Sequence, residues 1–364
     1  MCRLCGDVNL EKRNEVLESK LDGYTALVTG GRIKIGYETA LKLLRSGAFV
    51  VVTTRFPVDA VKRYSNEHDF DSWQNRLRVY QIDFRQMQSL FELVNYLYTE
   101  LGYLDILINN AAQTVRYPYE YYQKLVEYET DLYASLSETQ KSLIVWSWNS
   151  ESFDKLQCSL DSLLPATPLQ IKGECGTNEL EKPPKADLKR KFTQVDKFPK
   201  NSWTAKACDI SLIELLEVQL VNVTTPYFLC TNLRKLMEAS PRRYKHIVNV
   251  SAMEGKFSKK NKNCFHPHTN MAKAALNMLT RTSAQDFIKS GIIMNSVDTG
   301  WITDENPDWL RTKNEKRGLL PPLDAKDGAG RLCDPIFLSI NGEIYGEEPE
   351  SGLFLKDYFK KIEW

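Results

Sequence analysis

The sequence has no long apolar segment and no excess of charge of one sign. No stretch reaches 18 consecutive apolar residues, so no membrane-crossing helix is expected. A formal net charge of +1 provides no general attraction for nucleic acid or an anionic membrane surface. Apolar residues make up 42% of the chain and charged residues 26%, which is ordinary for a globular protein. We therefore expect neither a membrane partner nor a nucleic-acid partner.

Neither a secretory leader nor a disulfide framework is expected from the sequence. The first residues, MCRLCGDVNLEKRNE, have no apolar core after a basic start. The eight cysteines have no regular spacing, which is typical of reduced thiols and predicts a cytoplasmic location. Cys2 and Cys5 form a C-x-x-C pair without a second pair. Free thiols on a polar N-terminal tail (1–20) are the favoured interpretation, and a zinc site completed by a partner's cysteines is the alternative.

Short apolar runs alternate with helical stripes from residue 21 onward. This alternation predicts βαβ units and an α/β fold with a Rossmann-type, doubly wound parallel sheet. The expected strands are 24–29, 49–53, 78–82, 104–108, 246–250 and 292–297, and the clearest helices are 37–45, 212–236 and 271–288.

The alternation stops after Arg116 and resumes about ninety residues later. We interpret 117–206 as a long insertion before the fourth crossover helix, aromatic and helical at first, then partly disordered. Because the same pattern resumes, 21–116 and 207–305 are two halves of one domain. The remainder, 306–364, contains several turn signals and is expected to wrap the substrate side.

A glycine-containing loop, TGGRIKIG, follows the first expected strand and precedes the first helix. Glycines there let the backbone approach a pyrophosphate at the helix N-terminus. A tight turn without a ligand is the alternative for a lone glycine loop. The position between strand and helix favours dinucleotide binding.

Together with two later segments, this loop resembles the short-chain dehydrogenase/reductase family. The family pattern T-G-x-x-x-G-x-G is matched by Thr29, Gly30 and Gly36, with Lys34 at the middle glycine. Lys34 either crowds the pyrophosphate or pairs with a phosphate. The segment NNAA (109–112) is similar to the family's N-N-A-G. The resemblance covers 21–116 and 207–304, and it implies a dinucleotide bound by Thr29, Gly30, Ile35, Gly36, Asp83, Asn109, Ala111, Lys273 and Thr303.

Charge near the second strand indicates which dinucleotide binds. NAD-selective sites place a carboxylate there, whereas a 2′-phosphate requires a cation. The sequence reads Thr53-Thr54-Arg55, and Arg32 lies in the glycine loop. NADP(H) is therefore the expected cofactor and NAD(H) the alternative. The alternative explanation is that Arg32 and Arg55 are solvated surface residues that bind no phosphate.

Three of the family's four catalytic positions are matched, by Asn222, Ser251 and Lys273. The resemblance implies that the serine holds the substrate oxygen, the lysine lowers the pKa of a proton donor and the asparagine supports a water relay. The fourth position, the family's tyrosine, is Thr269, a far weaker acid. His268 and Lys273 are candidate substitutes. The segments HTNMAKAA and DTGWIT resemble an atypical subgroup that carries this threonine and has a cysteine-rich segment ahead of the domain.

Two functions follow from this resemblance. The first is an NADP(H)-dependent oxidoreductase that acts on an alcohol/carbonyl pair of a small-molecule substrate with a non-standard proton donor. The second is a catalytically silent dinucleotide-binding scaffold or sensor. Analogy with the family also implies a homodimer or homotetramer, and no metal site is expected.

Overall fold

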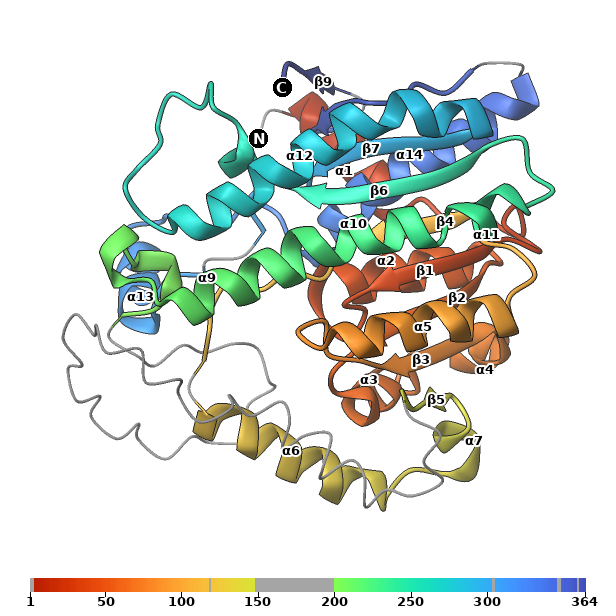
Figure 1. The fold of residues 1–364 in the computed structure, drawn as a ribbon, viewed down its shortest axis with the longest axis horizontal. Helices are drawn as coiled ribbons and strands as arrows, with labels where there is room; N and C mark the ends of the chain where they lie inside the picture. Colours follow the sequence, from red (N-terminus) through yellow and green to blue (C-terminus); the bar gives the residue numbers. More distant parts are fainter. Residues whose placement is uncertain (1–2, 118, 148–199, 303–304, 346–347, 359) are drawn as a thin grey trace.

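A single mixed sheet forms the centre of the protein (Figure 1). The structure, a computed structural model, describes residues 3–117, 119–147, 200–302, 305–345, 348–358 and 360–364. In these residues nine strands follow the order β5-β3-β2-β1-β4-β6-β7-β8-β9. Each strand is parallel to its neighbour except β9, which runs antiparallel to β8. Chain order reverses between β1 and β4, so the prediction of a doubly wound sheet is confirmed.

The six predicted strands are present within two residues of their expected bounds. They are β1 (Thr25–Thr29), β2 (Phe49–Thr54), β3 (Leu77–Gln81), β4 (Ile106–Asn109), β6 (Lys245–Ser251) and β7 (Ile292–Asp298). Three short strands at the sheet edges were not predicted: β5 (Ile144–Val145), β8 (Phe354–Lys356) and β9 (Lys360–Ile362).

Helices cover both faces of the sheet (Figure 1). One face carries α1 (Arg3–Asn14), α2 (Lys34–Arg45), α3 (Pro57–Tyr64) and α14 (Ala325–Tyr345). The other carries α5 (Met87–Glu100), α9 (Leu212–Gln219), α10 (Thr225–Asn232), α11 (Arg234–Glu238) and α12 (Pro267–Phe287). Alternate strand residues serve the two faces: Ala26 and Val28 pack in the first core cluster and Leu27 in the second. None of the helices in the described ranges meets the length and apolarity needed to cross a membrane.

The N-terminal residues form a helix, which corrects the expectation of a polar tail over 1–20. Helix α1 packs on α14, and its Asn9 is buried. The Asn9 amide donates to Asp327 Oδ1 (2.7 Å), and its oxygen accepts from Arg331 (2.9 Å) and from the Tyr358 hydroxyl (3.1 Å). This helix could not be predicted from an apolar pattern, because its sequence is polar and buried hydrogen bonds hold it in place. Cys5 is exposed on α1, and Cys2 lies outside the described residues.

The C-terminal segment (306–364), which was expected to wrap the substrate side, contributes a helix and a strand to the core of the fold. Helix α14 packs against α2, and β8 pairs with β7 to extend the sheet. Of the insertion, the described part contains α6 (Tyr119–Tyr133), α7 (Glu138–Lys141) and β5, which pairs with β3. The expectation of disorder concerns 148–199, which lie outside the described residues.

Replacing Asn9 tests the buried polar network of α1. We expect Asn9→Ala to lower the free energy of unfolding by about 1–3 kcal/mol, because Asp327 and Arg331 keep their burial and lose a partner. Chemical denaturation measures the change. The matched control is Asn14→Ala on the same helix, where the amide is exposed and bonds to Leu10 O. Equal effects of the two substitutions would contradict a role for the network.

Candidate functional site

A cavity of about 950 Å³ lies at the carboxyl ends of the central strands. Its wall includes Gly30 after β1, Thr54 of β2, Ser251 of β6 and Asp298 of β7. The carboxyl ends of parallel strands at the point where chain order reverses are the usual ligand site of this architecture. The fold therefore brings the glycine loop and the expected catalytic segment to one cavity.

The glycine loop is locked against the segment that follows β4. Thr29 Oγ1 accepts from the backbone N–H groups of Asn110 (2.9 Å) and Ala111 (3.0 Å). Gly30 has φ 70°, and a Cβ there would be 3.0 Å from Ala111 Cα. A Cβ at Gly36 would be 2.3 Å from Gly30 O. Because neither glycine has room for a side chain, the loop backbone at both positions borders the cavity directly. Helix α2 begins within the same loop.

Lys34 occupies the middle glycine position in a backbone conformation that favours glycine. Its φ is 55°, which costs a non-glycine residue about 1–2 kcal/mol. The ammonium group pairs with Glu305 at 2.9 Å. Lys34 therefore ties the glycine loop to the segment after β7, an arrangement that neither sequence interpretation foresaw.

Charged side chains gather beyond the ends of β2 and β3. Asp83 is buried, and Arg85 donates to both of its carboxylate oxygens. Burial raises the pKa of Asp83, but the Arg85 and Arg55 cations outweigh it and hold that pKa below its ordinary value. Arg32 pairs with Asp59 at 2.7 Å.

Arg55 lies differently from Arg32, although both line the cavity. Its guanidinium stacks 5.6 Å from the ring centre of Phe56 and 5.1 Å from that of Tyr122. Among the described residues it forms no ion pair. Of the two arginines expected at a phosphate, Arg55 is therefore the one without a direct ion pair among the described residues, although its charge also acts on Asp83.

Helix α6 from the insertion covers this end of the cavity. Its Glu129 carboxylate accepts from the backbone N–H groups of Val58 (2.8 Å) and Asp59 (2.7 Å) at the start of α3. Burial raises the pKa of Glu129 to about 7. An apolar cluster continues from this contact and contains Phe56, Val115, Tyr117, Tyr122 and Leu125, with Trp203 packed against it.

Asn222 lies behind the cavity wall, in a π-helical turn (Leu220–Thr224) between α9 and α10. Its side-chain oxygen accepts from Gln113 N (2.7 Å), and its Nδ2 donates to Gln113 O (3.0 Å). Such turns inside helices are frequent at functional sites. Here the turn fixes the segment that follows Asn110.

Ser251 and Lys273 both line the cavity. The Ser251 hydroxyl donates to Asn277 Oδ1 at 2.5 Å, and Lys273 Nζ donates to Val250 O at 2.7 Å. Burial lowers the pKa of Lys273 to about 8, although Glu254 and Asp298 oppose the shift. The lysine therefore remains mostly charged near neutral pH, at the side of the pocket where Ser251 lies.

Thr269 does not line the cavity, and His268 does not either. The Thr269 hydroxyl donates to His266 O at 2.9 Å. His268 is buried with its Nε2 3.5 Å from Glu214 Oε1, so it is not placed to act as the substitute acid. The residue that lines the cavity here is His266, which was not among the residues singled out from the sequence. The sequence does place His266 directly before Pro267, and a proline is common at the first position of a helix. That position could have indicated a residue at the helix start.

The residues expected to bind a dinucleotide fall into three groups. Those that line the cavity are Gly30, Arg32, Ile35, Gly36, Arg55, Asp83, Ala111 and Lys273. Thr29 and Asn109 lie behind its wall, where Asn109 donates to Asn249 Oδ1 at 2.8 Å. Thr303 lies outside the described residues.

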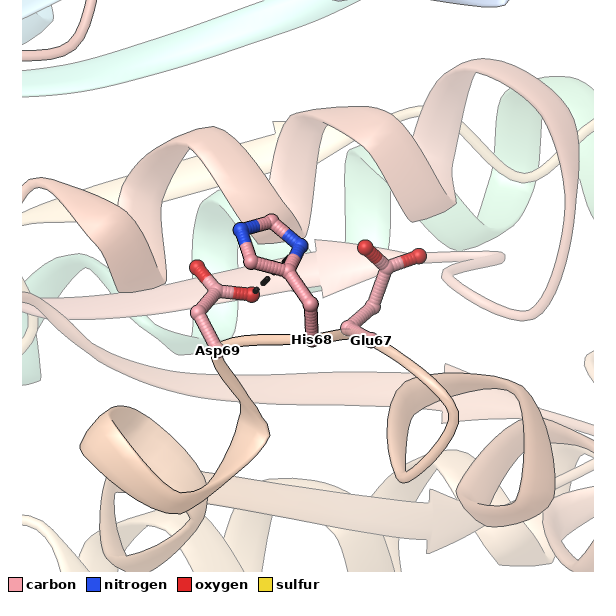
Figure 2. Close-up of side chains that lie close together, drawn as sticks. All are labelled: Glu67, His68 and Asp69. Carbon is pink, nitrogen blue, oxygen red and sulfur yellow. Dashed lines mark ion pairs between the residues drawn. The ribbon is translucent and has the colours of Figure 1, made fainter.

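Within the described ranges, Glu67, His68 and Asp69 form a cluster of possible metal ligands (Figure 2). None of the three lines the cavity. Arg45 donates to Glu67 (3.0 Å) and to Asp69 (2.7 Å). Because a cation already holds both carboxylates, the cluster is explained without a metal ion.

The chain matches known sequences over most of its length. The family model described as short chain dehydrogenase matches residues 24–130, and that described as enoyl-(acyl carrier protein) reductase matches 186–318. An uncharacterised protein of Acanthamoeba polyphaga mimivirus is 31% identical over 356 residues, 92% of this chain and 67% of that protein. The (+)-neomenthol dehydrogenase of Capsicum annuum is 40% identical over 90 residues, 24% of this chain and 28% of its own length.

Solved structures share the fold. A short-chain dehydrogenase from Burkholderia cenocepacia in complex with NADP matches with a TM-score of 0.56 and 17% identity, covering 93% of this chain and 97% of that one. A short-chain dehydrogenase/reductase of Serratia marcescens matches with a TM-score of 0.55 and 16% identity, covering 93% and 98%. The family models, the relatives and the sheet order agree: this chain belongs to the short-chain dehydrogenase/reductase family of oxidoreductases.

Proposed function

We propose that the protein is an NADP(H)-dependent oxidoreductase that interconverts an alcohol and a carbonyl group of a small-molecule substrate. One observation carries the proposal. A single cavity contains a bare glycine loop at one end and Ser251 with Lys273 at the other. A site of this kind can hold a dinucleotide and a second small molecule side by side.

The residues present fit a dinucleotide. Gly30 and Gly36 have no room for a side chain, both line the cavity, and α2 begins in the same loop, which suits a pyrophosphate at the helix N-terminus. Asp83 and Ala111 would face the adenosine half, and Lys273 the nicotinamide ribose. When bound, the dinucleotide supplies or accepts a hydride.

A preference for NADP(H) is supported by Arg55. Arg32 is already paired with Asp59, so a 2′-phosphate would find its cation mainly in Arg55. NAD(H) remains the alternative cofactor, because Asp59 also lies beyond β2. That carboxylate is held by Arg32 and Arg63, each at 2.7 Å, which leaves it little capacity for a ribose hydroxyl.

Ser251 and Lys273 would act on the substrate oxygen. The Ser251 hydroxyl turns from Asn277 to donate to that oxygen, which fixes the carbonyl group. The Lys273 ammonium stabilises negative charge that develops there. Thr269 cannot protonate the oxygen directly, because its hydroxyl is directed to His266 O.

A catalytically silent dinucleotide-binding scaffold or sensor is the second candidate, favoured only by Thr269. Mixing the protein with NADPH and a panel of carbonyl compounds, with binding and absorbance followed in parallel, separates the two. Tight binding without oxidation would favour the scaffold, and failure to bind either dinucleotide would contradict both. A homodimer or homotetramer remains a prediction by analogy with the family.

Adding a side chain to the glycine loop tests whether the loop binds the cofactor. We expect Gly36→Ala to abolish measurable binding of both dinucleotides, because the Cβ lies 2.3 Å from Gly30 O and the loop must move by about 1 Å or more. Isothermal titration measures binding. Gly102→Ala is the control, because nothing lies within 4 Å of a Cβ there. Undiminished binding by Gly36→Ala would remove the glycine loop from the site.

Arg55 is expected to determine the preference between the two cofactors. Arg55→Ala should weaken NADPH binding by about tenfold or more and leave NADH binding nearly unchanged, since a hydrogen bond to a charged group contributes about 1.5–3 kcal/mol. Arg55→Asp should shift the preference toward NADH. Arg78→Ala is the control, because Arg78 also stacks on an aromatic ring, that of Phe49, but lies outside the cavity. An unchanged ratio of the two dissociation constants in both Arg55 variants would rule out this assignment.

A further inference from the structure

The side chain that reaches the cavity from the start of α12 is a histidine. His266 precedes the helix with φ 40° and ψ 49°, a left-handed conformation that non-glycine residues adopt rarely. Its side chain lines the cavity although the residue is only 6% exposed. The imidazole stacks on the indole of Trp203, with ring centres 4.0 Å apart and planes 7° from parallel. Strained backbone of this kind is concentrated at functional sites.

Thr269 and Lys273 lie on one face of α12, because residues four apart share a side of a helix. His266 is the residue directly before that helix, and its ring is 3.3 Å from the Thr269 hydroxyl. Lys273 lines the same cavity as His266, and Thr269 lies between them behind the wall. The short threonine side chain thus leaves the cavity face to the imidazole, where a longer side chain at position 269 would compete for the space.

Thr269 also determines which nitrogen of His266 carries hydrogen. Its hydroxyl has one hydrogen, and the shorter of its two contacts, 2.9 Å, is the bond donated to His266 O. The other contact, 3.3 Å to His266 Nδ1, fits Nδ1–H as the donor and Oγ1 as the acceptor, and this is the tautomer on which the inference is built. With Nδ1 protonated, Nε2 is the nitrogen that can take up a proton.

We propose that His266 is the catalytic acid and base of this site, with Thr269 as the positioning residue that fixes its tautomer. The inference rests on the oxidoreductase function proposed above. In the oxidative direction, the substrate O–H bond breaks and its proton goes to Nε2. The C–H bond breaks and its electron pair leaves with the hydrogen to NADP⁺, and the C=O bond forms. The imidazolium then loses its proton to solvent, and the reductive direction reverses each step.

The charges around the ring agree with this role. Burial lowers the pKa of His266, whereas Glu254 and the Asn270 side chain favour the protonated ring, and His268 and Lys259 oppose it. Glu254 is itself paired with Lys259. His266 is therefore a neutral base near pH 7, and the imidazolium is populated below the ordinary histidine pKa of about 6.5.

The first test replaces the imidazole. His266→Gln should lower kcat for carbonyl reduction by about 100-fold or more, the usual loss when a general acid is removed. The matched control is His268→Gln, because His268 is buried two residues further along, in the first turn of α12, but lies outside the cavity. NADPH binding by each variant reports whether the site is folded. A His266→Gln variant that binds NADPH and keeps kcat within a few-fold would overturn the inference while the oxidoreductase function stands.

The pH profile and the state of the ring give independent readouts. Reduction needs the imidazolium, so kcat/KM should rise as the pH falls through the pKa of His266, and this limb should be absent in His266→Gln. Nitrogen-15 NMR of the protein's four histidines should show Nδ1–H for His266 and a perturbed pKa when NADP⁺ binds. Thr269→Val should abolish that tautomer preference and lower kcat, whereas Thr269→Ser should keep both.

The outcomes separate this inference from the function on which it rests. No turnover by the unmodified protein, with NADPH bound, contradicts the proposed function and the inference together. Two results would contradict the inference alone. One is turnover in which kcat/KM of His266→Gln still rises as the pH falls, and the other is an Nε2–H tautomer in the unmodified protein.

Discussion

The close approach of two backbone segments is the constraint on which the rest of the site depends. Thr29 and Asn110 join the glycine loop after β1 to the segment after β4, where the order of the strands reverses. This junction leaves no room for a side chain at Gly30 or Gly36. It therefore determines where α2 begins and where the cavity floor lies. The same segment is also held by Asn222, which bonds the backbone of Gln113.

Further contacts surround that junction. Lys34 ties the glycine loop to Glu305. Helix α6 adds an aromatic wall and caps α3 through Glu129. At the other side of the cavity, Thr269 lies behind the wall and His266 lines it. Lys34, Glu305 and the aromatic wall of α6 all border the cavity.

The strands could be predicted from the sequence wherever burial requires a continuous run of apolar residues. The six central strands are covered on both faces, so they are continuous apolar runs that can be recognised directly. Helix α1 was not predicted, because it is held by hydrogen bonds from Asn9 and Arg13 to a residue more than 300 positions away in the sequence. The strands β5, β8 and β9 are two or three residues long, too short to show a period.

At the site, matched motifs located Ser251 and Lys273 but gave no side-chain directions. His268 stands next to Thr269 in the sequence, yet helix geometry turns it toward Glu214, while His266, three residues before Thr269, faces the cavity. Whether a site with threonine in the tyrosine position transfers hydride is tested most directly with NADPH deuterated at the transferred position of the nicotinamide. Incubation with the carbonyl panel should give an alcohol with one carbon-bound deuterium, detected by mass spectrometry. An unlabelled panel, recovered from protein that has bound the deuterated cofactor, would contradict the account.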